Sequence, residues 1–237
     1  MEGFEFLALP EKYNGVDIIN YQYFHNLLNK RTVIFNGEVS EDIVETVILP
    51  LKDFEEDTSM EPVTLIIQSP GGSVADGMVL MNIIDNYTKP LKILVYGYAY
   101  SMGFAILCSG SKNKNVIKSC HRFTTALWHS GMVFLSGDAS AVGDIQDFNK
   151  QIDAKLKEYI LENTFIPQEL YEKKERHQFY FTAEELLRYG IIDEIIGEAK
   201  INSLCKECLL KRECENRLDC AFENNENFSC EDFELDA

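Results

Sequence analysis

Three short segments of the sequence contain residue types that could together carry out acyl transfer. Ser101 lies between an apolar run and a Met-Gly pair, His129 follows it by 28 residues, and the pair Gly71-Gly72 precedes it. A serine hydroxyl becomes a nucleophile when an imidazole accepts its proton, and paired backbone N–H groups stabilise the oxyanion that forms. The pattern therefore points to Ser101 as nucleophile, His129 as general base, and the N–H groups of Gly72 and Met102 as the oxyanion hole.

Each of these residues also has a plainer explanation. A serine at the start of a helix commonly serves as its N-cap, and a Gly-Gly pair commonly makes a tight turn. A histidine at the end of a strand can simply be a satisfied edge residue, although nothing local to His129 requires an imidazole. The sequence contains four histidines, and His121 lies in the polar turn Ser119-Cys120-His121-Arg122. The residue types alone leave both explanations open.

The segments that must position these residues alternate between strand and helix patterns. Short β-branched or apolar runs predict strands at 32–35, 63–69, 91–97 and within 116–129. Apolar residues at helical spacing predict helices from the candidate N-cap Ser40 to about residue 51, then at 74–87, 101–110, 145–161 and 182–190. Thr182 is the candidate N-cap of the last helix, Gly190 closes it, and a further strand follows. This alternation predicts an α/β fold with a largely parallel sheet.

Length, composition and charge narrow the class of protein. A chain of 237 residues that is 46% hydrophobic can bury a substantial core. Its net charge of −17 argues against nucleic acid and against anionic membranes as partners. No apolar run is long enough to span a bilayer, and the acidic N-terminus lacks the pattern of a signal peptide. We therefore expect a cytoplasmic protein, and acyl transfer of this kind requires no cofactor.

The C-terminal segment differs in character from the rest. Residues 1–19 predict an N-terminal arm and residues 20–200 the main domain, whereas residues 201–237 hold 10 acidic and 4 basic residues and five of the seven cysteines. A Cys-x2-Cys pair opens this segment, and thiolates at such spacing can bind a structural zinc ion. The candidate ligands are Cys205, Cys208, Cys214 and Cys220. The alternative is a reduced, disordered acidic tail whose cysteines have no such role.

Taken together, the motifs resemble the Clp protease proteolytic subunit family. The segments SPGGSV, YSMG, LWH and TAEELLRYGIIDEI occur in the family's order and spacing. The upstream segment KRTVIFNGEVSEDIVETVI is similar to the family's first strand and helix, so that the resemblance covers about residues 20–197.

The resemblance implies a specific architecture and activity. It implies a crotonase-like α/β fold of repeated β-β-α units, with the helix at 145–161 as the protruding handle helix. It further implies a serine endopeptidase that hydrolyses unfolded polypeptides inside homo-oligomeric heptameric rings, which stack as double rings and act with an AAA+ ATPase. By the same resemblance Ser101 is the nucleophile, His129 the base, and Gly72 and Met102 the oxyanion donors.

The sequence departs from the family at the third member of the triad. The family's aspartate falls at Gln178, and the nearest upstream acid is Glu175. A second departure is Gly131, where the family usually has proline. An aspartate fixes the histidine tautomer and stabilises the imidazolium, and its replacement by an amide costs a serine protease about 10⁴ in turnover. Three states are then possible: a weak peptidase with only the Ser-His pair, a triad completed by a remote acidic residue, or a family member that has lost activity.

Two alternatives to an active peptidase follow. A catalytically weak or inactive Clp-like subunit would serve a structural or regulatory role in a ring. A crotonase-fold enzyme acting on an acyl-coenzyme A thioester would also use paired N–H groups for an oxyanion. That enzyme would not need the Ser101 and His129 motifs at their present spacing.

Overall fold

The computed structural model describes residues 12–13, 16–17, 26–129, 138–174, 177–197 and 199–200. The whole Cys-rich segment 201–237 lies outside these ranges, together with its candidate ligands Cys205, Cys208, Cys214 and Cys220. Most of the predicted N-terminal arm, Gly131 and Glu175 also lie outside them. The zinc site and the division into arm, domain and tail therefore stay predictions.

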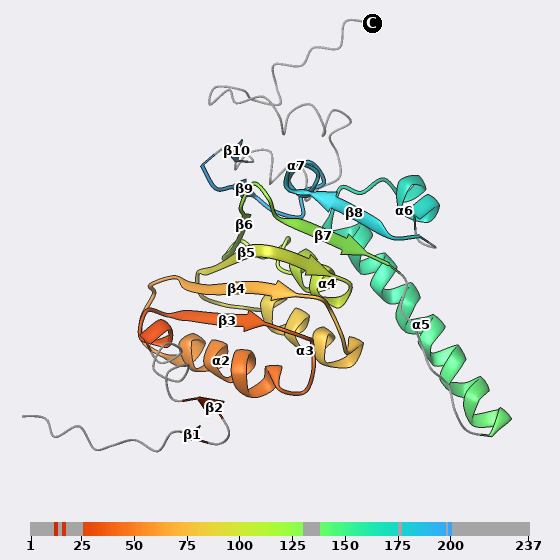
Figure 1. Cartoon of the computed structure of the whole chain (residues 1–237), viewed down its shortest axis with the longest axis horizontal. Helices are drawn as coiled ribbons and strands as arrows, with labels where there is room; N and C mark the ends of the chain where they lie inside the picture. The colour runs from red at the N-terminus through yellow and green to blue at the C-terminus, as the bar shows by residue number, and fades with distance from the viewer. Residues whose placement is uncertain are drawn as a thin grey trace, which may run out of the picture.

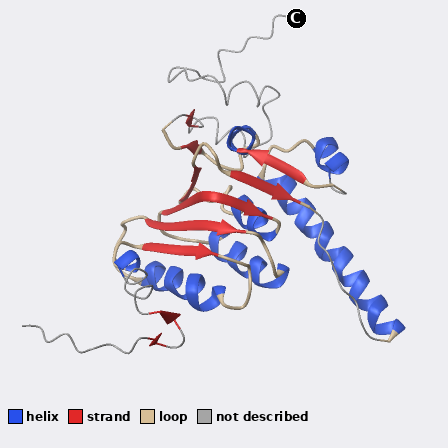
Figure 2. Ribbon diagram, in the orientation of Figure 1, coloured by secondary structure: helices blue, strands red, loops and turns tan. Residues whose placement is uncertain are grey.

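Strands and helices alternate along the chain as the sequence patterns predict (Figures 1 and 2). The strands are β1 (Lys12–Tyr13), β2 (Val16–Asp17), β3 (Thr32–Asn36), β4 (Val63–Ser69), β5 (Leu91–Tyr100), β6 (Val116–Cys120), β7 (Thr125–Trp128), β8 (Phe179–Thr182), β9 (Glu194–Ile195) and β10 (Ala199–Lys200). The helices are η1 (Val44–Ile48), α2 (Leu49–Glu56), α3 (Val74–Asp85), α4 (Met102–Cys108), α5 (Ala139–Asn163), α6 (Gln168–Lys174) and α7 (Ala183–Arg188).

Eight of the strands form one mixed sheet with a parallel centre. Its order is β10-β9-β6-β5-β4-β3, and all neighbours from β9 to β3 run parallel. The long strand β5 divides its partners, because Leu91–Val95 pairs with β6 whereas Tyr98–Tyr100 pairs with β7. Antiparallel pairing adds β8 to β7 and β10 to β9. The predicted α/β fold with a largely parallel sheet is confirmed.

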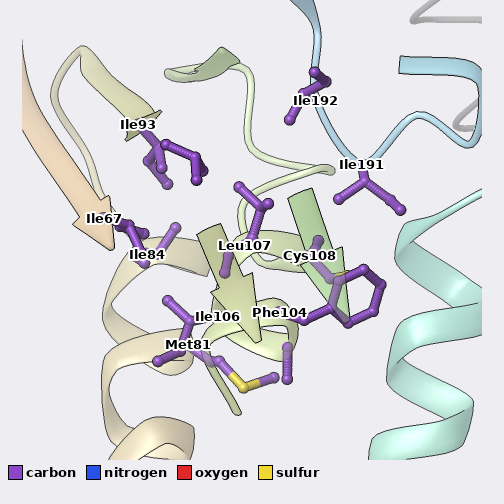
Figure 3. Close-up of a cluster of buried hydrophobic side chains, with 14 of the residues drawn as sticks. Ile67, Met81, Ile84, Ile93, Phe104, Ile106, Leu107, Cys108, Ile191 and Ile192 are labelled. Atoms are coloured by element: carbon purple, nitrogen blue, oxygen red, sulfur yellow. The ribbon is translucent and has the colours of Figure 1, made fainter. Parts of the chain in front are cut away.

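The core lies between this sheet and the helices that connect its strands. Every residue of α4 is buried, and its side chains meet those of α3, β4, β5 and the segment after α7 (Figure 3). Phe104 stacks on Phe181 with 5.0 Å between ring centroids. A seven-residue helix enclosed on all sides is held by packing rather than by its own propensity. The residues at both of its ends are therefore firmly placed.

The long predicted helix is present, but only part of its apolar stripe reaches the core. Leu156 and Ile160 are buried, whereas Ile145 and Phe148 have 44% and 60% of their surface exposed. The N-terminal half of α5 extends away from the sheet (Figure 1). The periodicity predicted the helix correctly, but this half of the stripe does not pack on the described core. The projection matches the handle helix expected from the resemblance.

Two predicted helix starts have different outcomes. Ser40 is not the N-cap of the first predicted helix, because Ile43 occupies the N-cap position and makes no side-chain cap hydrogen bond. A π-helical turn, η1, precedes Pro50 in this helix, because proline lacks an N–H and its ring crowds the carbonyl four residues earlier. Thr182 does cap α7 through a capping box with Glu185, and Gly190 follows that helix with a φ of +61°. No helix of the described ranges is long and apolar enough to cross a membrane.

Candidate active site

Ser101 occupies a sharp turn between β5 and α4. Its φ of 54° and ψ of −119° place it in a region that residues with a side chain rarely adopt. Its backbone N–H donates to the carbonyl oxygen of Leu127 on β7 at 2.7 Å, which fixes the turn against the neighbouring strand. A strained strand-to-helix turn of this kind presents a nucleophilic serine in α/β-hydrolases.

The side chain of Ser101 does not serve as a helix cap. Ser101 occupies the N-cap position of α4, yet its hydroxyl makes no cap hydrogen bond. The hydroxyl also accepts and donates no other hydrogen bond within the described part of the chain, and the residue is half-buried. The plainer explanation of this serine is therefore wrong, and its oxygen is available for chemistry.

A glycine turn lies directly against Ser101. Gly71 has a φ of +98°, and a Cβ added to it would stand 2.6 Å from Cβ of Ser101 and 2.9 Å from the nitrogen of Met102. Only a residue without a side chain permits this approach. The buried hydroxyl of Ser69 accepts from the Gly71 N–H at 3.1 Å and orders the turn. From the sequence we identified the Gly71-Gly72 pair but assigned a separate role only to Gly72 and no role to Ser69.

The two predicted oxyanion donors flank this close contact. Gly72, with a φ of +143°, is held by the bridge to Val39, whose N–H donates to Gly71 O at 2.8 Å and whose carbonyl accepts from Ser73 N–H at 2.7 Å. The N–H groups of Gly72 and Met102 have no hydrogen-bond partner in the described ranges. Two such N–H groups beside a serine can stabilise a developing oxyanion.

His129 and Gln178 adjoin the paired strands β7 and β8. The antiparallel register pairs Leu127 with Tyr180 and ends at Trp128 with Phe179, so that His129 directly follows β7 and Gln178 directly precedes β8. Leu127 also accepts the hydrogen bond from Ser101, which places His129 two residues beyond the strand position that touches the serine. Gln178, at the family's aspartate position, and the candidate base His129 therefore adjoin the same end of this strand pair.

The side chain at this third position is engaged by a tyrosine. Tyr180 on β8 donates its hydroxyl to Oε1 of Gln178, which directly precedes the strand, at 2.6 Å, and both side chains are exposed. A carboxamide carries no charge, so this position supplies no counter-charge to an imidazolium.

The backbone segments of the site are in contact with one another, whereas the side chains of the candidate nucleophile and base are not hydrogen-bonded to each other in the described part of the chain. Ser101, the glycine turn and the end of β7 are in direct contact, whereas no hydrogen bond joins the Ser101 hydroxyl to His129 in the described ranges. Catalytic hydrogen bonds are often long before substrate is bound. The described residues contain no group of three metal-ligating side chains. Ser101 at its strained turn, with the glycine turn against it, is an arrangement that can support attack by a serine on an acyl carbon.

The fold and the site together define a class: an α/β protein with a serine at a strained strand-to-helix turn and a glycine turn facing it. Residues 15–199 match the model of the Clp protease family. The chain belongs to the Clp protease family.

Curated relatives agree with this assignment. The chain is 28% identical over 190 residues to ATP-dependent Clp protease proteolytic subunit 1 of Prochlorococcus marinus (strain NATL2A), covering 78% of this chain and 92% of that protein. It is 29% identical over 175 residues to ATP-dependent Clp protease proteolytic subunit 2 of Thermobifida fusca (strain YX), covering 74% and 85%. The resemblance seen in the motifs therefore extends across most of both relatives.

Proposed function

We propose that this protein is the proteolytic subunit of a Clp-type protease and hydrolyses peptide bonds of unfolded polypeptides with Ser101 as nucleophile. The observation that carries the proposal is the strained, uncapped Ser101 at the start of α4, with Gly71 against its Cβ. Backbone strain at a residue whose side chain forms no structural bond is typical of a functional site.

The proposed reaction follows from the positions of these groups. His129 accepts the proton of Ser101 as Oγ attacks the scissile carbonyl carbon. The N–H groups of Gly72 and Met102 stabilise the resulting oxyanion. His129 then returns the proton to the leaving amine, and an acyl-enzyme remains on Ser101. A water molecule, deprotonated by His129, attacks the ester and releases the second product.

A fluorophosphonate probe tests the nucleophile directly, because it reacts covalently with an activated serine. We expect labelling of the full-length chain, its abolition in Ser101→Ala and its strong reduction in His129→Ala. The matched control is Ser140→Ala, which alters an exposed serine at the start of α5 that bonds to Asp138. Labelling that survives in Ser101→Ala would contradict the assignment.

The assembly that we propose is a homo-oligomeric ring, heptameric or a double ring, that works with an AAA+ ATPase. The two relatives reported above are named as subunits of ATP-dependent proteases. The projecting half of α5 exposes Ile145 and Phe148, an apolar surface suited to contact with another subunit. Mass photometry of the full chain is expected to show particles of seven or fourteen subunits, and a monomer at micromolar concentration would contradict this.

Gln178 favours a second candidate, a weak or inactive subunit that acts structurally within a ring. The amide of Gln178 carries no charge, and its oxygen already accepts from the Tyr180 hydroxyl. This candidate predicts rings that neither react with the probe nor cleave casein. Detectable labelling of Ser101 would exclude the inactive form.

A further inference from the structure

Lys118 is a lysine buried completely within the core. It lies on β6, its exposed surface is 0%, and it is among the largest fully buried side chains of the described residues. An ammonium group is rarely placed in a protein interior, because its loss of hydration must be offset by hydrogen bonds and charge interactions. Packing alone therefore does not explain why a lysine occupies this buried position.

The Lys118 ammonium lies at the C-terminal end of α4. Its Nζ donates to the carbonyl oxygen of Leu107 at 3.1 Å and to Oγ of Ser111 at 2.6 Å. The Ser111 hydroxyl in turn donates to the carbonyl oxygen of Cys108 at 3.0 Å. The last carbonyl groups of a helix have no partner within the helix and form its negative end. Lys118 and Ser111 thus satisfy the end of α4 with a positive charge.

The charge of Lys118 acts on the Cys108 thiol at this end of α4. Burial raises the pKa of the Cys108 thiol to about 12, and the nearby Lys118 charge opposes that rise. The backbone of Lys118 is itself fixed, since its N–H donates to Asp193 Oδ2 and its carbonyl accepts from the Asp193 N–H, both at 2.8 Å. The cation is therefore held in place from both its main chain and its side chain.

The opposite end of the same helix carries the candidate nucleophile. Ser101 directly precedes α4, and the Met102 N–H at its first residue is a proposed oxyanion donor. Seven residues span about 10 Å along a helix axis. Because all of α4 is buried, a displacement at Leu107 cannot be absorbed by solvent and is passed along the helix to Ser101.

We infer that Lys118 is a positioning residue for Ser101: it anchors the C-terminal end of α4 and adds positive potential along the helix towards the developing oxyanion. This inference rests on the proposed function, because it assigns Lys118 a part in the same reaction. Its substitution should slow the acylation of Ser101 beyond any effect on overall stability.

The test compares rates of fluorophosphonate labelling in full-length variants, each rate divided by the folded fraction. Lys118→Met removes the charge and keeps the length, and we expect labelling about fivefold to tenfold slower. Lys118→Arg retains the charge and should recover the rate to within about twofold. Lys89→Met is the matched control, since Lys89 is also nearly buried but is paired with Asp57 at 2.9 Å. That control should lose stability without a change in labelling rate.

A purely structural role for Lys118 gives a different result. Lys118→Met would then lower the melting temperature while the labelling rate of the folded protein stayed unchanged, which would overturn the inference. If Lys118→Met does not fold, Ser111→Ala takes its place, since it removes the 2.6 Å acceptor and keeps the cation. Slower labelling in Ser111→Ala supports the inference, and an unchanged rate overturns it.

Hydrogen exchange separates this inference from the proposed function. We expect faster amide exchange in Lys118→Met or Ser111→Ala to be concentrated in α4 and the turn at Ser101. Equal acceleration across β4 and β5 would overturn the anchoring role. If the unmodified protein does not react with the probe at all, the peptidase proposal fails, and the exchange pattern still decides whether Lys118 anchors α4.

Discussion

The Tyr180 hydroxyl donates to Oε1 of Gln178 at 2.6 Å, so the residue at the family's aspartate position has its own partner on β8. The bond uses one of the two lone pairs of the amide oxygen and leaves the amide uncharged. Any contribution of this position to catalysis is therefore limited to orientation of the imidazole.

Restoring a carboxylate at this position should accelerate the reaction. We expect Gln178→Asp to raise the rate of Ser101 labelling and of peptide hydrolysis at least tenfold, because a carboxylate stabilises the imidazolium. The upper bound is about 10⁴, the effect of the reverse change in a serine protease. Gln178→Asn is the matched control for side-chain length without charge and should give no gain. An unchanged rate in Gln178→Asp would mean that His129 already has an acidic partner elsewhere.

Adding one methyl group at the glycine turn should disable the site. In Gly71→Ala the new Cβ meets Ser101 Cβ at 2.6 Å and the Tyr100 carbonyl oxygen at 2.7 Å, and φ is +98°. A displacement of the nucleophile by about 1 Å can cost roughly a hundredfold in rate, and we expect a loss of labelling on this scale. Gly143→Ala is the control, because a Cβ there meets nothing within 4 Å. That helical substitution should stabilise the protein by up to about 1 kcal/mol and leave labelling unchanged.

The stability of the protein at acid pH should depend on Asp57. Hydrogen bonds from Arg31 and Lys89 lower the pKa of this carboxyl from 3.8 to about 2. Because the folded-state pKa lies below the unfolded one, the contribution is complete above about pH 4 and is lost as the pH falls towards 2. Asp57→Asn should therefore lower the free energy of unfolding at pH 7. Near pH 2 the free energies of unfolding of the variant and of the unmodified protein should lie closer together. Urea denaturation across this range measures the difference, and a gap that stays constant would contradict the assignment.

The contact between α3 and α5 should also contribute to stability. Tyr159 on α5 donates its hydroxyl to Asp85 Oδ2 at 2.7 Å, and the other oxygen of Asp85 accepts from the Gly110 N–H at 2.7 Å. Tyr159→Phe removes one hydrogen bond to a carboxylate with almost no change in shape. We expect the free energy of unfolding to fall by about 1–2 kcal/mol. Tyr180→Phe, at an exposed site, is the control and should change it by far less.

Apolar periodicity was sufficient to predict the central strands of the sheet and the helices α3, α4, α5 and α7, but it did not predict α6 or β8. The runs that became β3 and β4 are β-branched and end in turn residues, so their pattern depends on local sequence alone, whereas β5 continues past its predicted end at Gly97 to Tyr100. Periodicity does not reveal which surface an apolar face will pack against. Ile145 and Phe148 belong to the predicted apolar stripe but are exposed, whereas Leu156 and Ile160, farther along α5, are buried.

The candidate site was less predictable because its geometry depends on residues distant in sequence. The positive φ of Ser101 is maintained by a hydrogen bond to Leu127, and no local pattern near Ser101 encodes that contact. The role of Gly71 likewise arises from a neighbour thirty positions later. The position of Gln178, by contrast, follows from the family motifs, and in the structure this residue directly precedes β8, whose pairing with β7 ends next to His129.

The backbone angles of Ser101 affect the stability that the protein would gain or lose if this residue were replaced. A residue in such a conformation costs roughly 1–3 kcal/mol, which glycine would largely avoid. Ser101→Gly should consequently melt at a higher temperature than Ser101→Ala. A lineage with no need for the hydroxyl would therefore gain stability by a change of Ser101 to glycine.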